Sequence, residues 1–299
     1  MWVQSFAMQM QLQKPKIDLS AKIDLSAATF MIPVRIESAD RLRNVITTVS
    51  YLLTNFDTTV IVKEVDSTSV FEDKALPEIK KHCGDVRNLV HQFVCSSEPS
   101  FHRQYILNDM ILHSKTEIVV NYDCDVLLDP GTVVNAYQKI LQKQYDVIYP
   151  YGFGQYLFQV DADDKLVSEF LLGCRRGTSP EFSILKDRST PFQAEYGFVQ
   201  FFNRQVYIDG GLENENFVSY GPEDYERHHR FHTLGYKVGR IDDWVYHLEH
   251  TRGPNSSCKN PHNRKNRAEW NKIKRMDKAS LREYLSSQEY YKSRLQTVL

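Results

Sequence analysis

Two aspartates stand one residue apart, directly after a run of strand-forming residues. The stretch 116-TEIVVNYDCDVLLDPG-131 places Asp123 and Asp125 where the expected strand ends. Carboxylates this close repel each other, so we expect a positive charge to compensate them. Hard divalent cations bind carboxylate oxygens and bridge them to phosphates, which favours a metal site that holds a diphosphate. The alternative is an acidic loop that caps a helix beginning at Asp129-Pro130.

A second acidic pair follows a turn in 220-YGPEDYERHHR-230. Glu223 and Asp224 stand at the start of an expected helix, where the helix dipole favours negative charge. In that interpretation neither acid needs a catalytic role. In the other, one of them is a general base, which requires a carboxylate fixed at the rim of a pocket.

Histidines and arginines supply the remaining chemistry. His247 and His250 lie three apart in 246-YHLEHTRG-253, and imidazole is a common ligand of metals such as Mn²⁺, although such a pair is also often structural. Arg35 follows the first expected strand, and 101-FHR-103 opens a helix; both suit a nucleotide, or a solvated surface. Three further histidines are assigned to structural or surface positions in an amphipathic helix: His228, His229 and His232.

The composition limits the class of protein. The 299 residues are 41% hydrophobic and 25% charged, which is typical of a soluble globular protein. With 37 basic and 38 acidic side chains the formal charge is −1, which argues against a nucleic-acid partner. The sequence contains no apolar run of transmembrane length, and five cysteines without CxxC spacing indicate free thiols. We therefore expect a cytoplasmic protein without an integral membrane segment.

The elements that must position these residues alternate along the first half of the chain. We expect strands at 28–35, 58–65, 89–95 and 117–123, and helices at 38–56, 73–83 and 102–114. Such alternation predicts an α/β fold with a mostly parallel sheet flanked by helices, in which ligands bind beyond the carboxyl ends of the strands. In the less regular second half we expect strands at 145–151, 156–160 and 197–208, and helical structure at 276–295.

The domain organisation follows from composition. Residues 16–27 read KIDLSA twice, and we expect 1–27 to be a poorly ordered leader outside the fold. One continuous domain is predicted over 28–255, since no linker interrupts it. Residues 256–299 are expected to form a basic, helical C-terminal extension.

Six short motifs occur in an order known from one class of enzyme. The chain resembles GT-A fold glycosyltransferases, most closely the β1,4-galactosyltransferase family and the bacterial chondroitin-polymerase type domains, which are family 2-like. The resemblance covers roughly 28–255 and implies a Rossmann-like GT-A fold. The motifs that carry it are 32-IPVR-35, 101-FHR-103, 123-DCD-125, 210-GG-211, 221-GPED-224 and 247-HLEH-250.

The resemblance implies a role for each matching position. Asp125 matches the metal ligand, with His247, His250 or both as its partners, and Asp123 faces the ribose and metal-bound water. Asp224 matches the general base, and Glu223 the neighbour that binds acceptor hydroxyls. The positions that match the nucleotide-sugar site are Pro33, Arg35, Phe101, Arg103 and Gly211, with Glu64 as a weaker candidate for the base or ribose.

The implied activity is metal-dependent, inverting transfer of a hexose or N-acetylhexosamine from a UDP-sugar. The implied cation is Mn²⁺ or Mg²⁺, and the implied acceptor an oligosaccharide or lipid-linked glycan used for surface polysaccharide, with peripheral association at the inner membrane face. Tyr220 stands where the family has tryptophan; it can stack on a sugar, but with Pro222 in place of glycine it leaves the acceptor open.

Three other functions remain open. They are a retaining GT-A transferase, a catalytically silent nucleotide-sugar-binding protein, and a metal-dependent hydrolase or nucleotidyltransferase. A nucleotidyltransferase needs a glycine-rich phosphate loop after the first strand, and 33-PVRIESADR-41 has no glycine.

Overall fold

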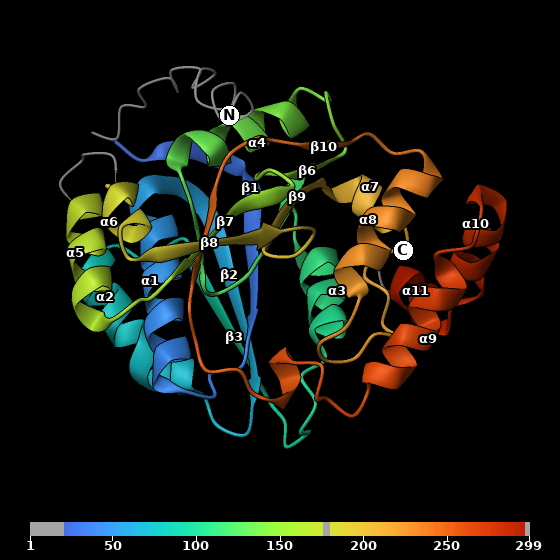
Figure 1. Cartoon of the computed structure of the whole chain (residues 1–299), viewed down its shortest axis with the longest axis horizontal. Helices are drawn as coiled ribbons and strands as arrows, with labels where there is room; N and C mark the ends of the chain where they lie inside the picture. Colours follow the sequence, from blue (N-terminus) through green and yellow to red (C-terminus); the bar gives the residue numbers. More distant parts are fainter. Residues whose placement is uncertain (1–20, 176–179, 297–299) are drawn as a thin grey trace, which may run out of the picture.

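The computed structural model describes residues 21–175 and 180–296. Within these residues a seven-stranded sheet runs through the middle of the molecule in the order β10-β6-β9-β4-β1-β2-β3 (Figure 1). Its strands are β1 (Ile23–Val34), β2 (Phe56–Asp66), β3 (Leu89–Cys95), β4 (Ile118–Tyr122), β6 (Val147–Tyr149), β9 (Val199–Asn203) and β10 (Val238–Arg240).

Most neighbouring strands in this sheet are parallel, because helices connect them. β1 pairs in parallel with β2 and β4, and β2 with β3, whereas β9 is antiparallel to both β4 and β6. The predicted fold class, a mostly parallel α/β sheet with a helical C-terminal end, is confirmed. The flanking helices of the first half of the chain are α1 (Ala39–Asn55), α2 (Leu76–Cys83) with a π-helical turn η1 (Phe71–Ala75) before it, α3 (Arg103–His113) and α4 (Pro130–Leu141).

A smaller, four-stranded sheet in the described chain carries the histidine motif. Its order is β5-β11-β7-β8, and β11 pairs antiparallel with β5, so that His247 lies opposite Val126. This pairing brings the chain after β4 next to the end of β11, as the backbone bond from Leu248 N to Asp125 O confirms at 2.8 Å. The strands are β5 (Val126–Leu128), β7 (Gly154–Val160), β8 (Ser189–Ala194) and β11 (Val245–Leu248).

Two expectations about element boundaries are wrong. β1 begins at Ile23, where it pairs with Phe56, so part of the segment expected outside the fold belongs to the sheet; residues 1–20 lie outside the described part. The expected strand 197–208 ends at Asn203, whose side chain caps α7 (Arg204–Asp209). The polar stretch 161–165 leads into α5 (Asp164–Arg175), which α6 (Phe182–Lys186) follows.

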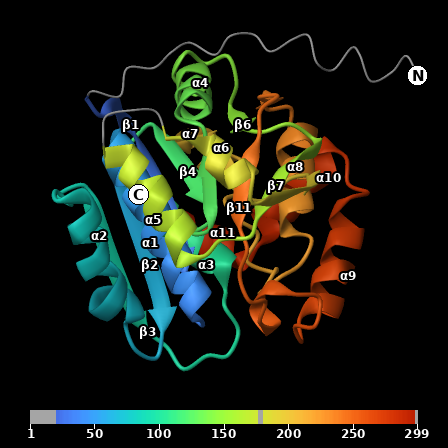
Figure 2. The same cartoon turned by 60° about the vertical axis from the view of Figure 1, so that its left-hand side comes forward.

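The C-terminal helices α9 and α10 pack beside α8 (Glu223–Leu234), as Figure 2 shows. A second hydrophobic cluster joins them to it through Phe217, Leu234, Ile273, Leu281, Tyr284 and Leu285. The helices are α9 (Asn263–Ile273), α10 (Lys278–Ser287) and α11 (Glu289–Gln296), with a 3-10 turn η2 (Pro254–Ser256) before them. The division into a 28–255 domain and an extension stays a prediction. No helix among the described residues is both long and apolar enough to cross a membrane.

Candidate active site

A cavity of about 580 Å³ lies at the carboxyl ends of β1 and β4. Its walls come from both sheets, from the start of α3 and from the start of α8. This is the edge at which an α/β sheet binds ligands. The predicted site residues that line it are Pro33, Phe101, Arg103, Asp123, Asp125, Tyr220, Glu223, Asp224, His247 and His250.

Asp125, His247 and His250 meet at one end of this cavity. The Asp125 carboxylate lies 3.2 Å from His250 Nε2 and 3.7 Å from His247 Nε2. One ligand atom from each residue falls within 4.8 Å of the others, and all three side chains are at most 8% exposed. A carboxylate and two imidazoles form a donor set suited to a borderline divalent metal.

The surroundings of these donors fit a metal site. His247 Nδ1 lies 3.6 Å from Glu249 Oε1, and both atoms are buried without a hydrogen-bond partner. A carboxylate facing the second nitrogen of an imidazole is the arrangement that orients a metal-ligating histidine. Burial acts to raise the pKa of Asp125, but His247 and then His250 outweigh it and hold that pKa well below its usual value. The carboxylate is therefore in the ionised form that a cation needs.

Asp123 is paired with a guanidinium instead of with these imidazoles. Its Oδ1 accepts a hydrogen bond of 2.6 Å from Arg103 Nη2, at the start of α3. Burial raises the pKa of Asp123 above its usual value, while Arg103 opposes the shift. The two aspartates of the motif thus have different partners, Arg103 for one and the imidazoles for the other.

The acidic pair Glu223-Asp224 forms the first turn of α8, at another wall of the cavity. Glu223 is 8% exposed, and its Oε2 is buried without a hydrogen-bond partner. Burial, and then the charge of Asp224, raise the pKa of Glu223 well above its usual value. The protonated acid is therefore favoured, and it can donate a hydrogen bond as well as accept one.

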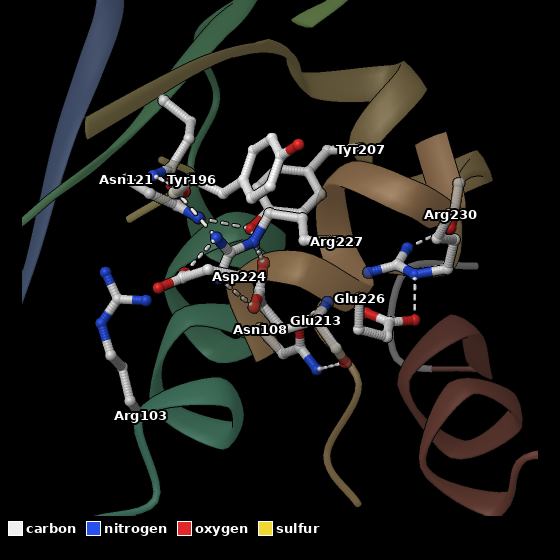
Figure 3. Close-up of polar contacts among 12 residues, drawn as sticks. Arg103, Asn108, Asn121, Tyr196, Tyr207, Glu213, Asp224, Glu226, Arg227 and Arg230 are labelled. Carbon is white, nitrogen blue, oxygen red and sulfur yellow. Dashed lines mark hydrogen bonds and ion pairs between the residues drawn. The ribbon is translucent and has the colours of Figure 1, made fainter. Parts of the chain in front are cut away.

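Asp224 is held by a fully buried arginine, which lies at the centre of Figure 3. Arg227 Nη1 donates to Asp224 Oδ1 at 2.7 Å, and its Nε and Nη2 donate to Glu213 at 2.6 and 2.8 Å. The second oxygen of Asp224 lies beside Gly197, where a Cβ would come within 3.1 Å of it. The carboxylate is thus fixed in orientation at the cavity wall.

Glu213 in turn is held from several sides. Its carboxylate accepts from the Tyr207 hydroxyl, and Asn121 Nδ2 donates to that hydroxyl at 2.5 Å. Asn108 bonds the Glu213 backbone, accepting from its N–H at 2.7 Å and donating to its carbonyl at 3.0 Å. Figure 3 shows this chain of contacts running from α3 and β4 to α8. The acid at the cavity is therefore supported by an interior network.

Three predicted nucleotide-site residues, Glu64, Gly211 and Arg35, are not among the residues that line the cavity, and the first two have clear structural roles. Glu64 is fully buried, and its oxygens accept from Ser69 Oγ at 2.6 Å and from the backbone N–H groups of Val70 and Phe71. Gly211 has φ +98°, and a Cβ there would come within 2.6 Å of Leu285. Both positions therefore serve packing and loop structure, which disfavours the predicted contacts with the nucleotide.

Arg35 acts indirectly on the cavity. Its guanidinium donates to the carbonyls of Val65 at 2.9 Å and Pro99 at 3.1 Å and lies 5.6 Å from the ring centre of Phe101. It braces the loop that presents Phe101 to the cavity. Its predicted direct contact with the nucleotide stays a prediction.

The sequence did not single out Arg41, which lines the cavity from the first turn of α1. Its Nε is buried without a hydrogen-bond partner. An unpaired guanidinium nitrogen beside Asp125 suits a phosphate oxygen. The available signal was its position in the first helix after β1, at the edge where parallel sheets bind ligands.

The α8 histidines lie in structural or surface surroundings. His228 is half-buried, with its ring 4.1 Å from that of Tyr196 and 5.7 Å from that of Tyr149. Burial, and then the charge of Arg240, lower its pKa to about 4. His229 packs edge-on against Trp270, and His232 is exposed.

Comparison with models of protein families finds no match, and comparison with curated proteins finds none either. Solved structures with a similar fold include the mannosyltransferase PcManGT from Pyrobaculum calidifontis in complex with GDP-Man and Mn²⁺. It is 16% identical with a TM-score of 0.48, over 81% of this chain and 62% of that one. S. aureus TarS 1-349 in complex with UDP-GlcNAc is 12% identical with a TM-score of 0.49, over 77% and 60%. The chain thus spans about 60% of the length of these structures, and likeness of this size carries no argument about function.

Proposed function

We propose that this chain is a metal-dependent glycosyltransferase that moves a hexose or N-acetylhexosamine from a UDP-sugar to a glycan hydroxyl with inversion. One observation carries the proposal. The acid-and-imidazole cluster of Asp125, His247 and His250 and the acidic pair of Glu223 and Asp224 line a single cavity. A reaction that needs a stabilised leaving group and a base uses both.

The donor half of the cavity suits a diphosphate. Asp125, His247 and His250 would hold Mn²⁺ or Mg²⁺, and the bound ion would supply charge to neutralise the departing diphosphate. Arg41 and Arg103 add fixed positive charge in the same cavity. Phe101 offers an aromatic face to the nucleotide base, and Asp123, held by Arg103, is placed to accept from a ribose hydroxyl.

The acceptor half suits a sugar hydroxyl. Asp224 would accept the proton of the attacking hydroxyl while Glu223 binds a neighbouring hydroxyl of the acceptor. Tyr220 is 41% exposed at the same wall and offers a ring face to a sugar. One base without a second carboxylate acting as nucleophile gives a single displacement and therefore inversion. We propose an oligosaccharide or lipid-linked glycan of a surface polysaccharide as the acceptor.

The first test is donor dependence on metal. A panel of UDP-sugars and GDP-sugars is incubated with the protein, with Mn²⁺ or with EDTA, and donor hydrolysis is measured by released nucleotide. We expect hydrolysis of at least one UDP-sugar with Mn²⁺ and none with EDTA. Hydrolysis that continues in EDTA would reject the metal-dependent mechanism. A preference for a GDP-sugar would show that the donor nucleotide carries guanine and not uracil.

The second test separates the two halves of the cavity. Asp125→Ala is expected to abolish Mn²⁺-dependent UDP binding and turnover together. Asp224→Asn is expected to keep UDP binding while turnover falls by roughly 10²–10⁴, the usual contribution of a general base. Asp161→Asn, at a side chain that is 88% exposed, is the matched control.

Normal turnover by Asp224→Asn would show that Asp224 is not the base. The anomeric configuration of the product, read by NMR, decides between inversion and retention. UDP-sugar binding without turnover of any acceptor or water would favour a silent nucleotide-sugar-binding protein.

A further inference from the structure

A second cavity, of about 360 Å³, lies beside the first. Tyr220 and Tyr225 line both cavities, so the two cavities adjoin at this pair of aromatic side chains. The other wall of the second cavity is α9, in the segment that sequence reasoning placed outside the main domain. A volume of this order is typical of small-molecule and sugar-sized sites.

Exposed aromatic rings line this cavity and offer faces on which a sugar ring can pack. Tyr220 and Tyr225 are each 41% exposed, and Trp270 of α9 lines the same cavity. His229 packs edge-on against Trp270 at 5.6 Å between ring centres, which fixes the indole from behind. Rings that stay exposed beside a reactive carboxylate can pack on the apolar face of a bound sugar.

The cavity also carries positive charge without a matching acid. Arg267 and Lys274 line it. The single acidic residue of 259–275, Glu269, accepts from the Tyr284 hydroxyl and so is engaged toward α10. The basic residues of this segment are Lys259, Arg264, Lys265, Arg267, Lys272, Lys274 and Arg275. A field of one sign at a lined cavity attracts an anionic ligand.

Buried amides hold α9 and the Tyr220 loop together. Asn266 donates to the carbonyl of Val218 at 2.8 Å, and Asn260 donates to that of Tyr220 at 2.7 Å. A Cβ at Gly221 would come within 2.7 Å of Asn266, so the loop lies directly against the helix. The second cavity is therefore built before any ligand arrives, which lowers the entropic cost of binding.

We propose that this second cavity is an acceptor subsite for an acidic glycan, with Arg267 and Lys274 holding the anionic group. The inference rests on the proposed function and names the class of its acceptor. A sugar ring packs on Tyr220 and Trp270, and the next residue of the glycan reaches Asp224 in the first cavity. A uronate carboxylate and a phosphate share the required chemistry.

The experiment compares charge pairs on one helix. Arg267→Ala/Lys274→Ala removes the two cations that line the cavity, whereas Arg264→Ala/Lys265→Ala removes two exposed cations of the same helix that do not. Titration calorimetry on the full chain uses three probes: a galacturonate hexasaccharide, a glycerol-phosphate oligomer of similar length and uncharged maltohexaose. Thermal unfolding verifies that both variants are folded.

We expect the wild type to bind at least one acidic probe more tightly than maltohexaose, and the lining variant to lose about tenfold or more of that affinity. The control variant should bind within about twofold of the wild type. The tighter acidic probe identifies carboxylate or phosphate as the group recognised. Equal binding of acidic and neutral probes, or an equal loss in both variants, would overturn the subsite.

UDP-sugar binding by the wild type is measured separately, so that two failures stay distinct. If UDP-sugar binds but the acidic probes show no preference, the subsite is wrong and the proposed function stands. If the acidic probes bind through Arg267 and Lys274 but no nucleotide sugar binds, the cavity recognises acidic glycans and the transferase proposal is wrong.

Discussion

The two acidic ends of the first cavity are stabilised in opposite ways. At the α8 end the protein supplies its own cation, since buried Arg227 contacts both Asp224 and Glu213. At the β4–β11 end no buried arginine or lysine among the described residues pairs with Asp125; two histidines surround it instead, and Glu249 faces one of them. A carboxylate that the fold has already paired with an arginine needs no further cation, whereas a carboxylate among imidazoles suits a cation from solution.

The largest expected effect concerns the built-in cation. Arg227→Met should lower the free energy of unfolding by about 3–5 kcal/mol, because it leaves the Glu213 carboxylate buried without a cation beside it. Urea unfolding measures this loss, and Arg282→Met, at an exposed position on α10, is the control. The double variant Glu213→Gln/Arg227→Met should recover part of the loss.

If Arg227→Met unfolds like the wild type, the α8 end is not held by its internal ion pairs. The two ends of the cavity would then differ in which residues they contain, but not in how their carboxylates are stabilised. If Mn²⁺ fully restored the unfolding free energy of Arg227→Met, the assignment of the two ends would also be wrong, because the metal is expected only at Asp125, His247 and His250.

A smaller effect is expected at the metal end. Glu249→Gln should weaken Mn²⁺ binding by about 10–100-fold, since a carboxylate that faces a ligating imidazole sets its orientation and basicity. Calorimetry with MnCl₂ alone measures the affinity, and Glu98→Gln, at an exposed loop position, is the control. Unchanged Mn²⁺ affinity would mean that His247 is oriented by other contacts.

The smallest effect compares histidines at the two ends. Asp125 raises the pKa of His250 against the effect of burial, whereas burial and Arg240 lower that of His228 to about 4 from the usual 6.5. Between pH 4 and pH 6.5, His228 is protonated in the unfolded chain but not in the folded chain. Stability should therefore fall as pH drops from 6.5 to 4.

His228→Phe removes this contribution and keeps a ring against Tyr196. We expect the loss of unfolding free energy over that pH range to shrink by roughly 1–2 kcal/mol, after allowance for partial exposure of the ring. His113→Asn, at an exposed position, is the control. An identical pH dependence in wild type and His228→Phe would show that the ring is hydrated in solution.

The sequence predicted the parts of the site that lie next to regular elements. Asp123 and Asp125 follow a five-residue buried strand, and the alternation of strands and helices is enough to locate that strand end. The first turn of α8 was predicted for the same reason, since a turn and two acids mark a helix start. These patterns involve residues that are close in sequence, so they can be recognised without knowledge of the fold.

The partners of these residues could not be predicted, because long-range contacts create them. Arg227 stands in a strongly charged helix and reads as a surface residue, yet it is fully buried because Glu213 meets it. Glu64 lies near the carboxyl end of β2, but backbone donors of the following turn bind it. The neighbouring sequence does not show whether such a charged side chain is exposed, lines a cavity or is buried against a distant partner.

The pairing of β5 with β11 has a consequence for a chain emerging from the ribosome. Asp123, Asp125 and β5 are synthesised long before His247 and His250, so a partly synthesised chain has the two aspartates without the imidazoles. The corner formed by Asp125, His247 and His250 is therefore completed only after β11 has been synthesised. Under the proposed function, an unfinished polypeptide would lack this metal site and could not hydrolyse a nucleotide sugar prematurely.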